Sequence, residues 1–157
     1  MSSFNRRSVL VLLALGGCGF TPALRIGAPA RQLLGTVRAQ DPEDEQDFDF
    51  VAAVEDRLGR PGAVLYDLRY TIVTATEGVA ITGEGAITRY NLSGAVDWTL
   101  TRVAGGQRMA GGREDSFTSY SATGSTVAGL TAEEDAARRL MTILADQIVA
   151  RLMALPA

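Results

Sequence analysis

The stretch from Thr88 to Val103 reads TRYNLSGAVDWTLTRV, and its alternation of apolar and polar residues decides the fold class. The apolar positions on one side are Tyr90, Leu92, Val96, Trp98 and Leu100. The polar positions on the other side are Arg89, Asn91, Ser93, Asp97, Thr99 and Thr101. A period of two is typical of a strand with one buried face. We therefore expect a sheet that is covered on one side and is solvated or bound to a partner on the other.

The segments on either side extend this sheet. Gly105-Gly106 offers two positions that accept positive φ and predicts a tight hairpin into a strand from Arg108 to Tyr120. The segment from Ala63 to Thr76 alternates in the same way, and Gly35 to Ala39 predicts a short further strand. The expected sheet has three to four antiparallel strands.

Two helices are expected against the buried face. Asp41 followed by Pro42 predicts a helix start, and apolar residues at spacings of three and four continue to Gly59. Thr131 and Glu134 form a capping box before a longer helix that is predicted to end at about Ala154. The expected fold is α+β, a two-layer sandwich with both helices on one face of the sheet.

The first twenty residues predict export and a lipid anchor. Arg6 and Arg7 precede an apolar run that is too short to span a bilayer, so this segment is typical of a signal peptide. Leu15-Gly16-Gly17-Cys18 resembles the lipobox, whose cysteine is acylated and becomes the first residue of the mature protein. We predict a signal peptide over residues 1–17, a lipidated tether over 18–34 and a single domain over 35–157.

Cys18 is the only cysteine, and acylation explains a lone thiol in an exported protein. Attachment of acyl chains such as palmitate at Cys18 predicts that the protein is held to the membrane. Gly19 favours sorting to the outer membrane over retention at the inner membrane. The Arg6-Arg7 pair fits both the Sec and the twin-arginine export routes, which stay open.

Composition excludes several classes of function. The chain has 15 basic and 18 acidic residues, a formal net charge of −3, which argues against binding of nucleic acid. It contains no histidine, so Ser-His-Asp and Cys-His nucleophilic sites are excluded and the commonest metal ligand is missing. The acidic clusters at 41–49 and 133–135 stand where helices are expected to begin, which the helix dipole explains. We predict no catalytic residue, no metal site and no cofactor.

Several segments together resemble the alphaproteobacterial form of LptE, the lipopolysaccharide-assembly lipoprotein. The matching pieces are Cys18-Gly19-Phe20-Thr21-Pro22, Thr88-Arg89-Tyr90-Asn91-Leu92, Ser119-Tyr120, the run from Ala132 to Leu140, and Leu144-Ala145-Asp146-Gln147-Ile148. They occur in the family's order and span nearly the whole chain after the lipobox. The resemblance implies a plug and assembly partner of the outer-membrane β-barrel LptD, which inserts lipopolysaccharide into the outer leaflet. It also implies a protein that is not an enzyme and is lipid-anchored at the cell outer membrane, facing the periplasm or inside the barrel lumen.

The resemblance further implies contact with the phosphates of lipopolysaccharide through basic residues in two loops, and here this chain departs from the pattern. The segments 78–86 and 121–130 contain no arginine. Candidate phosphate contacts must therefore come from arginines on the strands, and these are Arg89, Arg102, Arg108 and Arg113. A solvated arginine on the polar side of a sheet is the competing interpretation of each.

Two other functions are consistent with parts of the sequence. An auxiliary lipoprotein of an ABC-type phospholipid-transport system would also combine a lipobox with a small α/β domain, and its partner would be an inner-membrane or periplasmic complex. A periplasmic hydrolase that relies on carboxylates would need two acidic residues that converge in a cleft.

Overall fold

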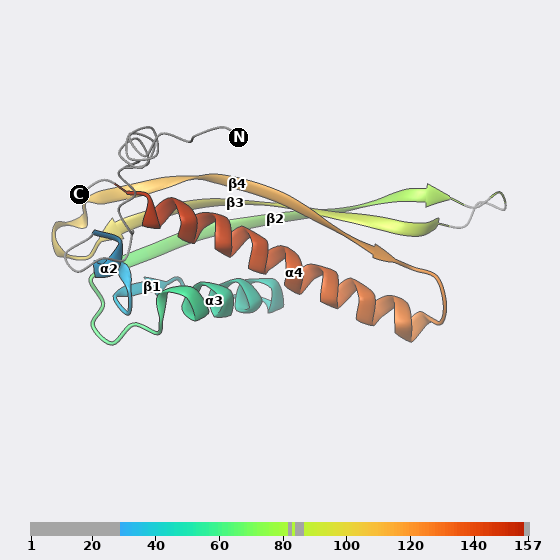
Figure 1. The fold of residues 1–157 in the computed structure, drawn as a ribbon, viewed down its shortest axis with the longest axis horizontal. Helices are drawn as coiled ribbons and strands as arrows, with labels where there is room; N and C mark the ends of the chain where they lie inside the picture. Colours follow the sequence, from blue (N-terminus) through green and yellow to red (C-terminus); the bar gives the residue numbers. More distant parts are fainter. Residues whose placement is uncertain (1–28, 82, 84–86, 156–157) are drawn as a thin grey trace, which may run out of the picture.

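The computed structural model describes residues 29–81, 83 and 87–155; the predicted signal peptide and Cys18 lie outside the described residues. The elements in chain order are α2 (Pro29–Leu33), β1 (Val37–Ala39), α3 (Glu45–Leu58), β2 (Tyr66–Ile81), β3 (Ile87–Arg102), the 3₁₀ turn η1 (Ala104–Gly106), β4 (Arg108–Ser121) and α4 (Thr126–Met153). The four strands lie side by side in the order β1-β2-β3-β4, with the helices on one face (Figure 1). The predicted two-layer α+β fold is confirmed.

The sheet is mixed rather than wholly antiparallel. β2 and β3 pair antiparallel along their length, with Tyr70 opposite Trp98, and β3 pairs with β4 in the same way, with Trp98 opposite Gly112. β1 instead runs parallel to β2, with Val37 opposite Tyr66. The expectation of an antiparallel sheet is therefore wrong at this strand. The reason is that α3 lies between β1 and β2 and returns the chain to the same end of the sheet, as a crossover helix does.

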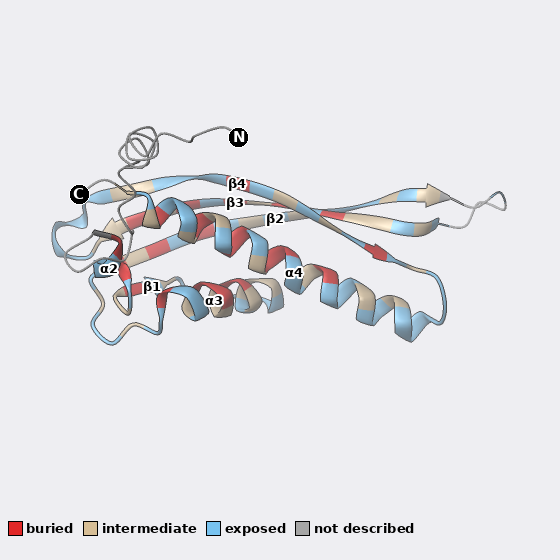
Figure 2. Ribbon diagram, in the orientation of Figure 1, coloured by how far each residue is buried: buried red, intermediate tan, exposed pale blue. Residues whose placement is uncertain are grey.

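The core lies between the helices and the covered face of the sheet, as the alternation in β3 predicted. Fully buried side chains come from both layers, and the largest are Phe50, Leu58, Leu68, Leu100, Leu140, Met141, Leu144, Ile148 and Leu152. Figure 2 shows buried segments on α3, on α4 and along the strands. Two ion pairs link α3 to α4. Asp49 of α3 pairs with Arg138 of α4 (Oδ2 to Nε, 3.8 Å), and eight residues later in both helices Arg57 pairs with Asp146 (Nε to Oδ1, 2.8 Å). The two helices therefore run in the same direction.

α3 and α4 each begin at a different residue from the one that the sequence predicted. α3 begins after Asp44, not Asp41, because the Asp44 carboxylate accepts the backbone N–H of Asp47 at 2.8 Å and so caps the helix. Asp41 and Pro42 belong to the preceding loop.

The capping box at Thr131 is also not the start of its helix. α4 begins six residues earlier, where the Ser125 hydroxyl accepts the N–H of Ala128 at 3.3 Å. The Thr131 hydroxyl donates to the Val127 carbonyl at 3.1 Å inside the helix. A threonine that has this partner can stay within a helix.

The predicted ends and turns agree better with the structure. α3 ends at Leu58, and Gly59 follows with φ of +79°. Gly105 and Gly106 both have positive φ, +86° and +65°, but they form a 3₁₀ turn rather than a two-residue hairpin loop. Residues 29–33, inside the predicted tether, form α2, whose Leu33 is buried in the core.

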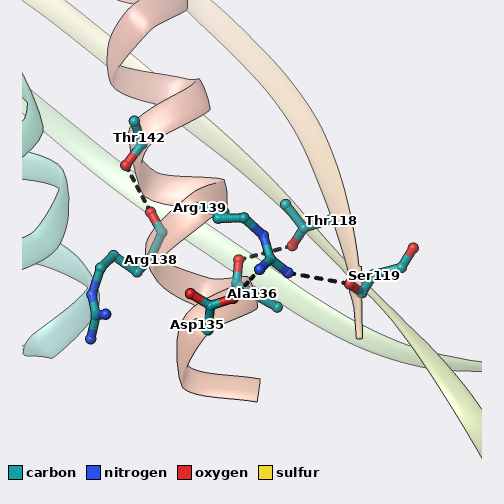
Figure 3. A network of polar contacts seen from close by, with 7 residues as sticks. All are labelled: Thr118, Ser119, Asp135, Ala136, Arg138, Arg139 and Thr142. Atoms are coloured by element: carbon teal, nitrogen blue, oxygen red, sulfur yellow. Dashed lines mark hydrogen bonds and ion pairs between the residues drawn. The ribbon is translucent and has the colours of Figure 1, made fainter. Parts of the chain in front are cut away.

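α4 covers the outer edge of β4 with its polar side chains. The Thr118 hydroxyl donates to the Ala136 carbonyl at 2.9 Å, and Arg139, which also pairs with Asp135, donates to the Ser119 carbonyl at 3.4 Å (Figure 3). Further along, Gln147 Nε2 donates to the Asp115 carbonyl at 3.4 Å. The Ser119 and Asp115 carbonyls point away from β3, so α4 supplies partners that a fifth strand would otherwise supply.

Candidate functional site

The uncovered face of the sheet is the candidate functional site. Because successive side chains of a strand point to opposite faces, the residues between the buried positions share this face. The strand register places Arg69, Thr99 and Gly111 in one row across β2, β3 and β4. The next rows are Thr71, Asp97 and Arg113, then Val73, Ala95 and Asp115, then Ala75, Ser93 and Phe117.

Arg108 and Arg113, two of the four predicted arginines, both lie on this face, opposite Thr101 and Asp97 of β3, which are roughly 13 Å apart along the strand. Arg113 Nη1 donates to Asp97 Oδ2 at 2.6 Å, and both side chains are more than half exposed. Arg108 lies opposite Thr101, and its guanidinium extends over Gly111, where a Cβ atom would collide with Nη2. Gly111 therefore leaves the space that the Arg108 side chain occupies.

Arg102 and Arg89 are placed elsewhere. Arg102 lies opposite Tyr66, which is buried on the helix side, and its Nη1 donates to Gln107 Oε1 at 3.4 Å. Arg89 lies opposite Ser121 near the far end of β3. Eight residues separate it from Asp97, which corresponds to roughly 26 Å along a strand. The structure thus places Arg108 and Arg113 on the same face of β4, whereas Arg89 lies near the far end of β3 and Arg102 faces the helices.

Arg69 belongs to this cluster although the sequence did not single it out. It is exposed, and no carboxylate of the described residues lies within ion-pairing distance of Arg69 or of Arg108. The alternation in β2 put Arg69 on the polar side. What the sequence lacked was the register, which places Thr99 of β3 between Arg69 and Gly111.

Two hollows adjoin on the uncovered face. One, of about 600 Å³, includes Arg69, Thr99, Arg108 and Asp97 in its lining. The other, of about 570 Å³, is more apolar, and Val73, Ala75, Ala95 and Phe117 are among its lining residues. Val73 is 60% exposed and Phe117 65% exposed, so two large apolar side chains, one on β2 and one on β4, face solvent on this side of the sheet. This combination can bind a group that is anionic at one end and apolar at the other.

Other kinds of site find no support within the described residues. They contain no group of three or more His, Cys, Asp or Glu residues that could hold a metal ion. They also include no helix that is long and apolar enough to cross a membrane. The two tyrosines with displaced pKa values lie on the covered side: burial raises the pKa of Tyr70 and of Tyr120, and the nearby Asp47 and Glu133 carboxylates add to these effects.

The comparison with protein families shows the family of this chain. The sequence model described as "LptE: Lipopolysaccharide-assembly" matches residues 34–152, which is nearly the whole described body. The chain belongs to the LptE family. A comparison with curated protein sequences finds no match.

Solved structures share the LptE-type fold. A lipoprotein from Caulobacter crescentus CB15 superposes with a TM-score of 0.66 at 20% identity, over 79% of this chain and 92% of that one. Rare lipoprotein B from Shewanella oneidensis gives a TM-score of 0.58 at 15% identity, over 74% and 91%. A minor lipoprotein from Acinetobacter baumannii gives 0.54 at 16% identity, over 76% and 89%. At these identities the likeness shows the fold, and the LptE family match carries the functional argument.

Proposed function

We propose that this protein is an outer-membrane lipoprotein that plugs the LptD barrel, helps it to assemble and takes part in delivering lipopolysaccharide to the outer leaflet. The observation that carries the proposal is the family match over residues 34–152, which begins just after α2, extends into the last turn of α4 and so includes every strand. The lipobox-like segment that ends at Cys18 agrees with it. The LptE family is a non-catalytic lipoprotein family, generally associated with the outer membrane.

The described surface is consistent with binding rather than catalysis. Among the described residues one face of the sheet carries no helix, and this face holds Arg69, Arg108 and Arg113 and the exposed Val73 and Phe117. We infer that the protein acts through its surface, as the absence of histidine in the sequence also indicates.

The lipid anchor is a separate part of the proposal. Acylation of Cys18 would hold the domain to the inner leaflet of the outer membrane. Replacing Cys18 by Ala should abolish acylation, measured by labelling with a palmitate analogue, and should release the protein from the membrane fraction. Retention of the Cys18→Ala variant in the membrane with unchanged labelling would contradict this assignment.

Affinity purification tests the proposed partner. The acylated protein, isolated from detergent-solubilised outer membrane, should bring with it a barrel of LptD type, and depletion of the protein should reduce lipopolysaccharide at the cell surface. Recovery of the protein without a partner, with normal surface lipopolysaccharide after depletion, would refute the proposal. Recovery of an inner-membrane ABC complex would instead favour a role in phospholipid transport.

A further inference from the structure

We propose that the end of the domain where α2 begins docks on a bilayer surface that contains anionic phospholipid. The inference rests on the proposed acylation of Cys18 and adds to it a second membrane contact, made by the folded domain itself. The docking surface, which we name the basal end, consists of three segments: residues 29–36, 59–65 and 102–108. They include α2, the link from α3 to β2, and η1.

Backbone hydrogen bonds join the three segments into one surface. Gly62 donates its N–H to the Gly35 carbonyl at 3.0 Å. Leu65 donates to the Thr36 carbonyl, and Val103 donates to the Leu65 carbonyl, both at 2.9 Å. In Figure 1 these loops and α2 lie together at the left end of the molecule, whereas the far ends of β2 and β3 and the start of α4 lie at the right. The basal end is therefore a continuous surface at one end of the long axis.

The charge of the basal end is suited to an anionic surface. Its three segments contain no aspartate or glutamate and four arginines, namely Arg31, Arg60, Arg102 and Arg108. Three acidic residues lie within four positions of these segments. Glu55 pairs with Arg60 (Oε2 to Nε, 3.2 Å), Asp67 pairs with Arg38 (Oδ1 to Nη2, 2.7 Å), and Asp56 is exposed. The positive excess that is left attracts anionic headgroups.

The other end of the molecule has the opposite composition. Segments 77–81 and 122–135 contain no arginine, and their acidic residues are Glu77, Glu133, Glu134 and Asp135. Charge therefore changes sign along the long axis of the domain. A negatively charged bilayer attracts the basal end and repels the far end, so it orients the domain.

Exposed apolar side chains accompany the arginines of the basal end. Leu34 is 38% exposed, Leu65 50% and Val103 49%. The hydrogen bonds described above place Leu65 and Val103 on adjoining loops, and Leu34 is two residues before Thr36. A surface that combines apolar side chains with basic ones is typical of a protein that lies in the interface of a bilayer. The arginine stems can lie against the apolar side chains while the guanidinium groups bind phosphate.

The tether connects the lipid to this end of the domain. Pro29, the first residue of α2, follows Cys18 by 11 positions, which span at most about 40 Å. β2 alone rises by roughly 50 Å from Tyr66 to Ile81. An acylated Cys18 therefore keeps the basal end near the bilayer at a high effective concentration, at which weak individual contacts are sufficient for docking.

The first experiment measures how close each end of the acylated protein lies to lipid. Because acylation blocks the Cys18 thiol, a fluorophore can be attached to one introduced cysteine. Ala104→Cys places it in the basal end, and Ala128→Cys, also at an exposed alanine, places it at the start of α4 as a control. In vesicles of phosphatidylcholine and phosphatidylglycerol, a quencher on the lipid headgroup should quench the label at position 104 and not the label at position 128. Equal quenching at both positions, or none at 104, would overturn the proposal.

Charge variants test the arginines. Arg31→Gln combined with Arg60→Gln should lower the ratio of docked to undocked protein by roughly 30-fold, because each arginine near an anionic surface accounts for about a fivefold change. Quenching at position 104 should fall with this ratio, and high salt should lower it in the same way. The control, Arg138→Gln combined with Arg139→Gln, removes the same charge from exposed positions on α4 and should leave quenching unchanged.

Two results would contradict the role of charge. Equal loss of quenching in both double variants would show that only the net charge of the protein matters. Unchanged quenching in vesicles of pure phosphatidylcholine would show that anionic lipid is not recognised. Either result overturns the proposal.

Apolar variants distinguish a lipid surface from a protein partner. Leu65→Ser combined with Val103→Ser should reduce quenching at position 104, whereas Val127→Ser combined with Leu130→Ser, which changes two exposed apolar residues of α4, should not. All four side chains are exposed, so the variants should fold, which circular dichroism checks. If the Leu65 and Val103 variant loses the barrel in affinity purification but keeps its quenching, the basal end contacts a protein and the docking on lipid is refuted.

Flotation of the protein with the vesicles separates this inference from the proposed function. Protein that floats with the vesicles but shows no quenching at position 104 is anchored without docking, so the inference fails and the anchor stands. Protein that does not float is not anchored, so the proposed role of Cys18 fails and the inference fails with it.

Discussion

The contact between Gly94 and Leu140 offers a quantitative test of how α4 packs on the sheet. Gly94 lies in the middle of β3 under α4, and a Cβ atom placed there would be 2.9 Å from Cδ2 of Leu140 and 3.4 Å from Cδ1 of Leu144. Leu140 itself is fully buried. The helix can approach the sheet this closely because residue 94 has no side chain, so the two positions should be energetically coupled.

We predict that each single substitution destabilises the protein and that the pair does so by less than the sum. Leu140→Ala should cost about 2–5 kcal/mol of unfolding free energy, since it leaves a cavity between α4 and β3. Gly94→Val should cost about 1–3 kcal/mol because its methyl groups overlap Leu140. In the double variant the valine fills part of the cavity, so the coupling should be about 1–2 kcal/mol.

Urea unfolding of the full-length protein in detergent provides the measurement. Trp98 is the only tryptophan and is buried in the core, so its fluorescence reports loss of the packed state. As a control, Gly129→Ala should be neutral or stabilising by up to about 1 kcal/mol, because no atom lies within 4 Å of the added Cβ and alanine favours the helix. Free energies for Gly94 and Leu140 that add within about 0.5 kcal/mol would refute the coupling and the close approach it assumes.

Three further predictions concern single side chains. Asp44→Ala should destabilise the protein by about 1 kcal/mol in urea unfolding, because it removes the cap of α3, and Asp41→Ala should destabilise it by much less. A larger effect of Asp41→Ala would contradict the cap at Asp44 and support the helix start predicted from sequence. Arg151→Ala should cost about 1–3 kcal/mol, because it leaves the buried Glu114 carboxylate without its partner at 3.1 Å; an effect below about 0.5 kcal/mol would contradict this. Folding raises the pKa of Tyr70 above 10.0, so stability should fall as the pH rises beyond 10. Tyr70→Phe should shift the midpoint of alkaline unfolding upward, and an unchanged midpoint would argue against this contribution.

The sequence predicted the layers of the fold because the signals for them are local. In β3 the alternation of Leu92, Val96 and Leu100 with polar residues is complete within one strand, and all three are buried as expected. The helix starts were harder, since several residues near each start can cap a helix. Asp41 and Asp44 both satisfy the rule, and only the surrounding loop selects Asp44.

The candidate site depended on information that no single segment contains. Which arginines become neighbours is set by the pairing of β2, β3 and β4, and this register cannot be read from the alternation alone. Arg69 and Arg108 are 39 positions apart in sequence yet lie on either side of one strand. Arg102 is the opposite case, because it lies two residues after the buried Leu100 on β3 and so falls on the covered side by alternation alone.

The polar contacts from α4 to the edge of β4 determine when, during folding, this edge is protected from aggregation. Gln147 and Arg139 belong to a helix that follows the sheet in the chain, so the carbonyls of Asp115 and Ser119 stay exposed until α4 has docked. An unsealed β edge can pair with the edge of another molecule. Until its last helix is in place, each newly made molecule should therefore depend on chaperones to remain separate from its neighbours.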